Sequence, residues 1–210
     1  MGAQLLVLNH PERALPYLEA AHRADPSDAA TDYALGRALL NVGRAADAVP
    51  HLQHGFDAGI ELPQGGYDLA VALQATADFP AAASVIRRIN PPASDDPEAW
   101  LRLGRLAAQV RAPDVAEPFF KRAVEMRPDR ADTHQQLGLN LLILEKFDEA
   151  ARELAEASQL DPRDADSLSH LAYCELKIGR PADARAHALA ALALDPEDQL
   201  AKGIIRAGGS

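Results

Sequence analysis

An apolar spacing recurs every 34 residues along most of this chain. It is clearest in residues 131–164, where small or apolar side chains stand at Leu137, Gly138, Leu141, Ala150, Leu154, Ala157 and Pro162. This spacing places the side chains on one face of each of two helices, and the break at residues 146–148 separates the helices. Because one such hairpin cannot bury its apolar face alone, it must stack on its neighbours. The period therefore predicts an all-α fold of stacked helical hairpins.

The segments on either side repeat this pattern in phase. One period earlier, the equivalent residues are Leu103, Gly104, Ala116, Phe120, Ala123 and Pro128. One period later, they are Leu171, Ala172, Ala184, Ala188, Ala191 and Pro196. Three segments in register are hard to obtain by chance, so we interpret them as copies of one structural unit.

The segment 97–130 also matches a known repeat family. Most of the tetratricopeptide repeat (TPR) pattern is reproduced by Trp100, Leu103, Gly104, Ala116, Phe120 and Pro128. The chain resembles a TPR protein over nearly its whole length. That resemblance implies a right-handed α-solenoid of stacked antiparallel helix pairs, the TPR superhelix. The sequence departs from the family where the aromatic residue usual in the middle of the first helix is replaced by Ala107, Leu141 or Glu175.

The repeats predict the organisation of the chain as a single solenoid domain over residues 1–210. Its expected parts are a partial repeat over 1–28, repeats over 29–62, 63–96, 97–130, 131–164 and 165–198, and a C-terminal capping helix over 199–206. Asp96, Asp164 and Asp198 stand where a capping side chain would precede a helix. Because residues 1–9 match only the second half of a first helix, we expect this sequence to be part of a longer protein.

Charge and hydropathy argue against several functional classes. The formal net charge is −10, whereas a nucleic-acid-binding surface needs clustered positive charge. No apolar run is long enough to span a membrane, and Leu5–Leu8 is too short for a signal peptide core. We therefore expect a cytoplasmic protein without direct membrane insertion, or a periplasmic one if a native signal is missing. The alanine-rich composition suggests a bacterial source.

The candidate catalytic and metal-ligating residues have simpler structural explanations. His51 and His54 share a helix face, but no third ligand stands at a recognisable interval, so no metal site is expected. The pairs Asp95–Asp96 and Glu149–Glu153 fit helix capping and solvated helix faces. Cys174 is the only cysteine, and we expect a small buried thiol there. No catalytic motif is recognisable, so we expect a non-enzymatic protein without a cofactor.

The resemblance also implies a binding groove. In TPR proteins the first helix of each hairpin lines the concave surface. Carried over position by position, the expected partner-binding residues are Tyr33, Arg37, Asn41, Tyr67, Arg102, Arg105, Gln109, Gln136, Leu139, Leu142, Ile143, His170, Tyr173 and Lys177.

Two features of this set suggest the chemistry of a partner. Leu139, Leu142 and Ile143, near Tyr173 one unit on, would be exposed apolar surface unless neighbouring helices bury them. Arg102 and Arg105, one unit before, form a positive spot. We hypothesise a peptide or partner helix with an apolar anchor and a nearby carboxylate or phosphate.

Some TPR proteins grip the C-terminal carboxylate of chaperones through a clamp of lysines, asparagines and an arginine. If Arg102 is aligned with the clamp arginine, the other four positions hold Glu98, Asp68, Arg37 and Tyr33 instead of the expected residues. This mismatch argues against a chaperone-tail adaptor.

The sequence thus predicts a protein-interaction scaffold that binds a protein or peptide and no nucleic acid. One alternative is the regulatory or substrate-docking arm of a larger enzyme such as a transferase. Another is self-association into a homo-oligomer through the open N-terminal edge at Leu5–Leu8.

Overall fold

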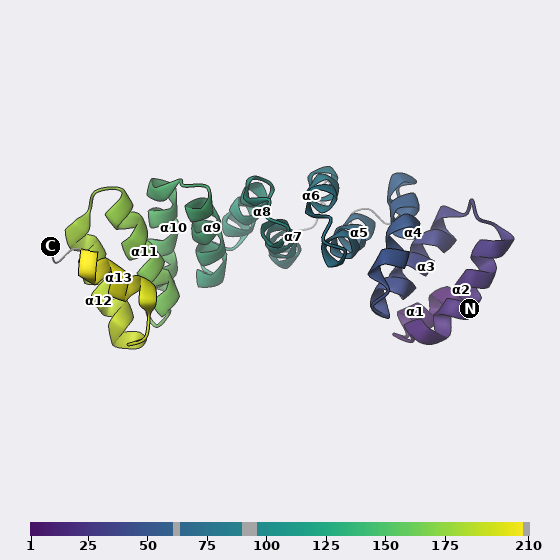
Figure 1. Cartoon of the computed structure of the whole chain (residues 1–210), viewed down its shortest axis with the longest axis horizontal. Coiled ribbons are helices and arrows are strands. Elements are labelled where there is room, and N and C mark those ends of the chain that lie inside the picture. The colour runs from purple at the N-terminus through teal and green to yellow at the C-terminus, as the bar shows by residue number, and fades with distance from the viewer. Residues whose placement is uncertain (61–63, 90–95, 208–210) are drawn as a thin grey trace. The chain divides into compact units, whose positions relative to one another are not determined.

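The computed structural model describes residues 1–60, 64–89 and 96–207, and the regular structure within these ranges is entirely helical (Figure 1). In chain order the helices are α1 (Gly2–Val7), α2 (Pro11–Ala24), α3 (Ala29–Asn41), α4 (Ala45–Asp57), α5 (Gln64–Ala75), α6 (Phe79–Arg88), α7 (Pro97–Gln109), α8 (Pro113–Met126), α9 (Ala131–Ile143), α10 (Phe147–Leu160), α11 (Ala165–Lys177), α12 (Pro181–Leu194) and α13 (Gln199–Ala207). This arrangement confirms the predicted all-α fold of stacked helix pairs.

The helices keep the period that the sequence predicts. The first helices α7, α9 and α11 begin 34 residues apart, at Pro97, Ala131 and Ala165. The second helices α8, α10 and α12 keep the same interval, beginning at Pro113, Phe147 and Pro181. Within the described part of the chain, every helix falls short of the length and apolarity that a bilayer crossing requires.

The chain divides into two compact units. The first comprises Met1–Ser94 with Gln109–Arg111, and the second comprises Asp95–Ala108 with Ala112–Ser210. In the first unit α3 packs on α2, α4 and α5, and in the second α11 packs on α10, α12 and α13. The organisation of residues 1–210 as one solenoid domain stays a prediction. The predicted boundary between residues 62 and 63 lies outside the described residues.

Aspartate side chains begin several of the helices, as the sequence predicts. The Asp96 carboxylate accepts a hydrogen bond from the Glu98 backbone N–H at 3.0 Å, and that of Asp164 accepts one from Asp166 at 3.1 Å. Asp198 accepts from two backbone N–H groups at the start of α13, at 2.9 and 3.0 Å. These bonds satisfy backbone donors that the first turn of a helix leaves unpaired.

A left-handed residue follows the first helix of each hairpin. Positive φ angles occur at Asn9, Gly43, Ala77, Arg111, Glu145 and Gly179, which are 34 residues apart. At this position the chain reverses, and the next backbone N–H bonds back across the turn, as from Lys146 to the Leu141 carbonyl at 2.9 Å. Backbone hydrogen bonds therefore hold the hairpin turn in the left-handed conformation, and non-glycine residues adopt it at a steric cost.

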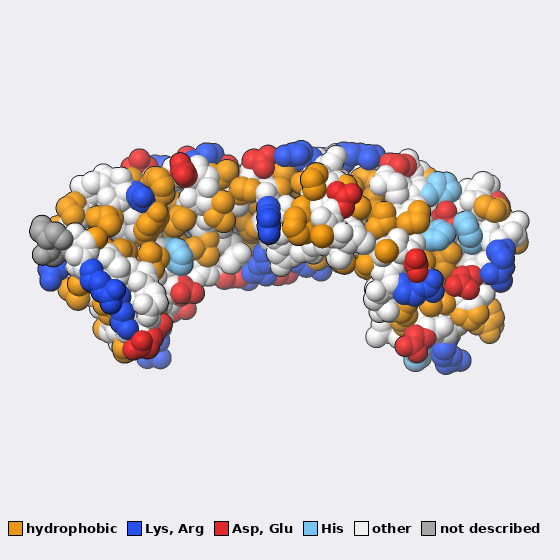
Figure 2. Space-filling model, in the orientation of Figure 1, with side chains coloured by type: hydrophobic (Ala, Val, Ile, Leu, Met, Phe, Trp, Pro, Cys, Tyr) orange, Lys and Arg blue, Asp and Glu red, His pale blue; other side chains and the backbone are white. Residues whose placement is uncertain are grey.

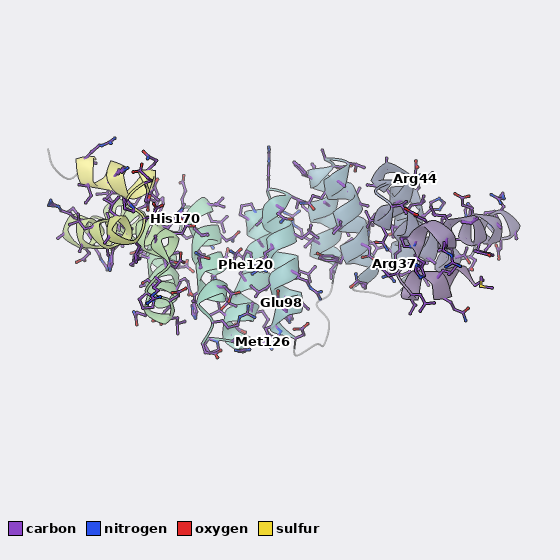
Figure 3. All side chains as sticks on the ribbon, turned by 90° about the horizontal axis from the view of Figure 1, so that it is seen from below. Arg37, Arg44, Glu98, Phe120, Met126 and His170 are labelled. Carbon is purple, nitrogen blue, oxygen red and sulfur yellow. The ribbon has the colours of Figure 1, made fainter. Side chains whose placement is uncertain are left out.

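Glycine on the first helix lets the second helix approach closely. A Cβ atom added to Gly138 would lie 2.7 Å from Leu154 Cγ, and one added to Gly104 would lie 2.6 Å from Phe120 Cε1. Figure 3 labels Phe120 on α8, with Glu98 and Met126 at the shared end of α7 and α8. Each close contact therefore pairs a glycine on one helix with a large buried side chain on the other.

In the last hairpin, α11 and α12 make the equivalent close contact through two small side chains. Its equivalent positions hold Ala172 and Ala188, and both side chains are fully buried. They belong to a core cluster with Ala201 and Ile204 of α13, which packs on α11 and α12. A Cβ atom fits on the first helix here because the facing side chain is small.

We predict that Gly138→Ala lowers the free energy of unfolding by about 1–3 kcal/mol, because the added methyl overlaps Leu154. Leu154→Ala alone also destabilises the chain, by about 2–5 kcal/mol through a cavity. The double variant places two alanines in contact, as at Ala172 and Ala188. Its decrease in the free energy of unfolding is therefore expected to be smaller than the sum of the decreases in the two single variants.

Urea denaturation followed by circular dichroism measures these changes. Gly203→Ala is the matched control, because a Cβ there meets no atom within 4 Å and alanine favours the helix. Equal effects of the substitution at Gly138 and Gly203 would contradict the close-packing interpretation.

Candidate partner-binding surface

In the first unit, two of the predicted groove residues are engaged within the protein. Tyr33 is 4% exposed, and its hydroxyl donates a hydrogen bond to Asp68 Oδ2 at 2.9 Å. Arg37 Nε lies 3.2 Å from the same oxygen, and the guanidinium stands 5.6 Å from the Tyr33 ring centre. These contacts link α3 to α5. Of the remaining predicted residues here, Asn41 is exposed and Tyr67 is half-buried.

The predicted positive spot in the second unit is largely neutralised. Arg105 lies 3.6 Å from carboxylate oxygens of both Glu98 and Asp132. Arg130 binds the same two carboxylates at 3.3 and 2.6 Å, and its hydrogen bond to Asp132 is the main cause of its raised pKa. Arg102 is exposed and forms no ion pair with any described residue. Of these three arginines, Arg102 is the one without a carboxylate partner among the described residues.

Side chains of three successive helices make up a surface that we call the α9–α11 face. It comprises Leu139, Leu142 and Ile143 of α9, Phe147 of α10, and Tyr173 and Lys177 of α11. Ile143 is 63% exposed, whereas Leu139 and Leu142 are half-buried. The Tyr173 and Phe147 rings are 6.3 Å apart, and Lys177 Nζ stands 5.2 Å from the Tyr173 ring centre. Tyr173 also packs against the core of the last hairpin. The face thus carries an exposed aliphatic side chain on α9, and an aromatic pair with a nearby cation on α10 and α11.

The other predicted residues are spread over both units. Gln136 is half-buried, and Gln109 is exposed at the end of α7. His170, labelled on α11 in Figure 3, donates from Nδ1 to the Asp166 backbone oxygen at 2.7 Å. Its ring is therefore held along its own helix.

The structure brings together a group that the sequence analysis missed, the histidine cluster of His22, Asp32, His51 and His54. The imidazole Nδ1 atoms of His22 and His51 lie 2.6 and 3.2 Å from Asp32 Oδ1. His54 Nδ1 lies 2.7 Å from Oδ2. Figure 2 shows pale-blue histidines gathered around an acidic side chain over α2, α3 and α4. His51 and His54 thus lie near further potential metal ligands, His22 and Asp32, which the spacing of residues in the sequence did not indicate.

The Asp32 carboxylate is charged although its side chain is only 6% exposed. Burial opposes ionisation, but the hydrogen bond from His54 and the nearby imidazoles of His22 and His51 outweigh it and lower the pKa of Asp32. One feature of the sequence could have predicted the contact between Asp32 and His51. These residues are 19 positions apart, the same separation as between His134 and Glu153, which also pair. The second pair occupies the same repeat positions with the acid and the base exchanged.

Comparison with known proteins identifies related sequences and folds. A family model described as tetratricopeptide repeat matches residues 3–54, 67–131 and 136–199. The structure of YrrB, a TPR protein with an unusual peptide-binding site, is 17% identical with a TM-score of 0.71, covering 90% of this chain and 97% of YrrB. MamA from MSR-1 is 26% identical with a TM-score of 0.61, covering 77% of this chain and 92% of its own.

A third similar structure is the first TPR of Spaghetti (RPAP3) bound to the HSP90 peptide SRMEEVD. It is 16% identical with a TM-score of 0.52, covering 55% of this chain and 91% of its own. No curated protein matches the chain in sequence.

Cys174 is fully buried in α11, in agreement with the expected buried thiol. Burial, with a smaller contribution from the Glu175 carboxylate, raises the pKa of the Cys174 thiol to about 11. The thiolate is the reactive form of cysteine, and it is scarce at neutral pH when the pKa is this high. The site therefore disfavours both nucleophilic and redox chemistry at this residue.

We predict that Cys174 in the folded chain reacts at least about 100-fold more slowly with an aromatic disulfide reagent at pH 8 than in urea, where its pKa returns to about 8.5. Raising the pH toward 11 should speed the reaction of the folded chain. Stopped-flow absorbance gives both rates, with circular dichroism showing that the chain stays folded. Equal rates in buffer and urea at pH 8 would refute the prediction.

Proposed function

Because the chain belongs to the tetratricopeptide repeat family, we propose that it is a protein-interaction scaffold that holds a peptide or a partner's helix on the α9–α11 face. The observation that carries this proposal is the exposed Ile143 beside the half-buried Leu139 and Leu142. Apolar side chains grouped at a surface favour a partner that removes them from water. TPR repeats are generally interaction modules, so we assign the chain a role in binding and not in catalysis.

The charges around the face define the partner further. Lys177 is exposed at one side of the Tyr173 ring, and Arg102 is exposed on α7 of the same unit. Because Arg105 is engaged by Glu98 and Asp132, an acidic group of the partner would pair with Lys177 or Arg102. The proposed partner segment carries a large apolar anchor with a carboxylate nearby.

Proteins of the same fold provide precedent for peptide binding. YrrB has an unusual peptide-binding site, and the first TPR of Spaghetti binds a peptide of HSP90. In this chain Asp68 and Glu98 stand where a carboxylate clamp would need asparagine and lysine, and both interact with arginines of the chain itself. We therefore propose recognition through the apolar anchor, with the acidic group secondary.

Self-association through α1 is a second candidate. Val7 is 86% exposed and Leu8 is 65% exposed at the end of this short helix, and Tyr17 of α2 is 52% exposed. Such side chains favour contact with a second apolar surface, which another copy of the chain would supply.

We predict that Ile143→Asp weakens the binding of peptides selected against the native chain from a random peptide library by at least about tenfold, or roughly 1.4 kcal/mol. Because Ile143 projects into solvent, the substitution should leave the helical signal and the melting temperature nearly unchanged. Fluorescence anisotropy with a labelled peptide measures the affinity.

The matched control is Leu189→Asp, which places the same charge at an exposed apolar position on the second helix α12. Its affinity should equal that of the native chain. If both variants bind the selected peptides equally well, or both lose them equally, the α9–α11 face is not the binding site.

For self-association, we predict that Val7→Asp with Leu8→Lys converts any oligomer of the native chain to a monomer, because each charge must be desolvated at the contact. Multi-angle light scattering over a range of protein concentrations measures the mass. A native chain that is monomeric throughout, or an oligomer that persists in the double variant, would rule out this second candidate.

A further inference from the structure

One of the contacts in the histidine cluster lacks hydrogen-bond geometry. His22 Nδ1 lies 2.6 Å from Asp32 Oδ1, yet this buried nitrogen makes no hydrogen bond with any residue that the structure describes. A buried polar atom without a partner is costly, so its retention calls for a further interaction. An imidazole nitrogen and a carboxylate oxygen facing each other this closely are the donor atoms of a metal site.

The cluster also contains more imidazoles than its carboxylate needs. In two other described pairs one imidazole binds one carboxylate: His134 Nδ1 lies 2.8 Å from Glu153, and His187 Nδ1 lies 2.8 Å from Glu175. At Asp32 three imidazoles from α2 and α4 converge on two oxygens. Histidine is the commonest metal ligand among side chains, and three in contact with one buried acid form a concentrated donor set.

The distances suit a small divalent ion. The nearest ligand atoms of His22, Asp32 and His51 all lie within 4.8 Å of one another. Zinc stands about 2.0–2.1 Å from nitrogen and oxygen ligands, which places tetrahedral ligand atoms about 3.3 Å apart. The contacts of 2.6 and 3.2 Å therefore need to widen by less than about 1 Å, and the widest pair of ligand atoms needs to close by at most about 1.5 Å. Both changes are within reach of imidazole and carboxylate rotation.

The cluster can be reached from solvent. An open pocket is lined by Glu19, His22 and His51, among other residues of α2 to α4. The side chains of His22 and His51 are 30% and 22% exposed, whereas that of Asp32 is 6% exposed. The imidazoles of His22 and His51 can therefore be reached from this pocket, and the Asp32 carboxylate lies buried in contact with them.

We propose that His22, Asp32 and His51 bind one divalent transition-metal ion of the zinc type, and that His54 positions the Asp32 carboxylate through its other oxygen. Two imidazoles and one carboxylate leave at least one coordination position open to water or to a donor from a partner. The ion joins α2, α3 and α4, so its binding stabilises the first unit.

The test uses the full chain without a polyhistidine tag and Co²⁺ alone as the probe, because its visible absorption reports the coordination. One equivalent of Co²⁺ should give a saturable absorption band that Zn²⁺ abolishes, and Zn²⁺ should raise the melting temperature. His22→Gln and His51→Gln should each weaken Co²⁺ binding at least about 100-fold. His54→Gln should weaken it about 10-fold, the effect of losing an outer hydrogen bond.

His134→Gln and His170→Gln are the matched controls, since each removes one histidine outside the cluster. Both should bind Co²⁺ as the native chain does. Asp32→Asn, which keeps the side-chain size, should abolish binding while circular dichroism shows native helix content. Absence of stoichiometric Co²⁺ binding to the native chain, retained binding in Asp32→Asn, or equal losses in His51→Gln and His170→Gln would each overturn the proposal. None of these readouts depends on peptide binding at the α9–α11 face.

Discussion

The close contact between the two helices of each hairpin is the constraint on which the rest of the structure depends. At Gly138 and Gly104 the missing Cβ makes room for Leu154 and Phe120, and these large side chains are then fully buried. The last hairpin reaches the same contact with two alanines, Ala172 and Ala188. Because a hairpin held this tightly still has apolar surface to bury, it packs on a neighbouring hairpin of its own unit, as α4 does on α5 and α10 does on α11.

Stacking also decides which side chains remain available for binding. Some first-helix side chains that were expected to bind a partner instead make contacts within the chain. Tyr33 and Arg37 both bind Asp68. Arg105 lies between Glu98 and Asp132. Such ion pairs screen the positive charges that a free groove would offer. In the second unit Ile143 of the α9–α11 face and the cations Arg102 and Lys177 remain exposed, and on these side chains we base the proposal of a partner with an aliphatic or aromatic anchor.

The sequence predicted the helices and their phase well, because both follow from short-range spacing. The positions of Gly138, Leu154 and Pro162 recur in neighbouring segments, and the corresponding helices begin at the same interval. The sequence predicted the pairing and the exposure of surface side chains less well. Nothing in the order of residues indicates that Arg105 meets Asp132 across two helices, or that Tyr33 is only 4% exposed. Side-chain pairing depends on rotamers and on neighbours far away in the chain, which a repeat pattern averages out.

By itself, the sequence determined the helical period, the family, the caps at Asp96, Asp164 and Asp198, and the burial of the lone Cys174. Each of these follows from local spacing or from a residue's own chemistry. Only the tertiary structure decided that His22, His51 and His54 meet on Asp32. Those residues come from three helices at unequal intervals, and they become neighbours because hairpin stacking brings α2 and α4 against α3.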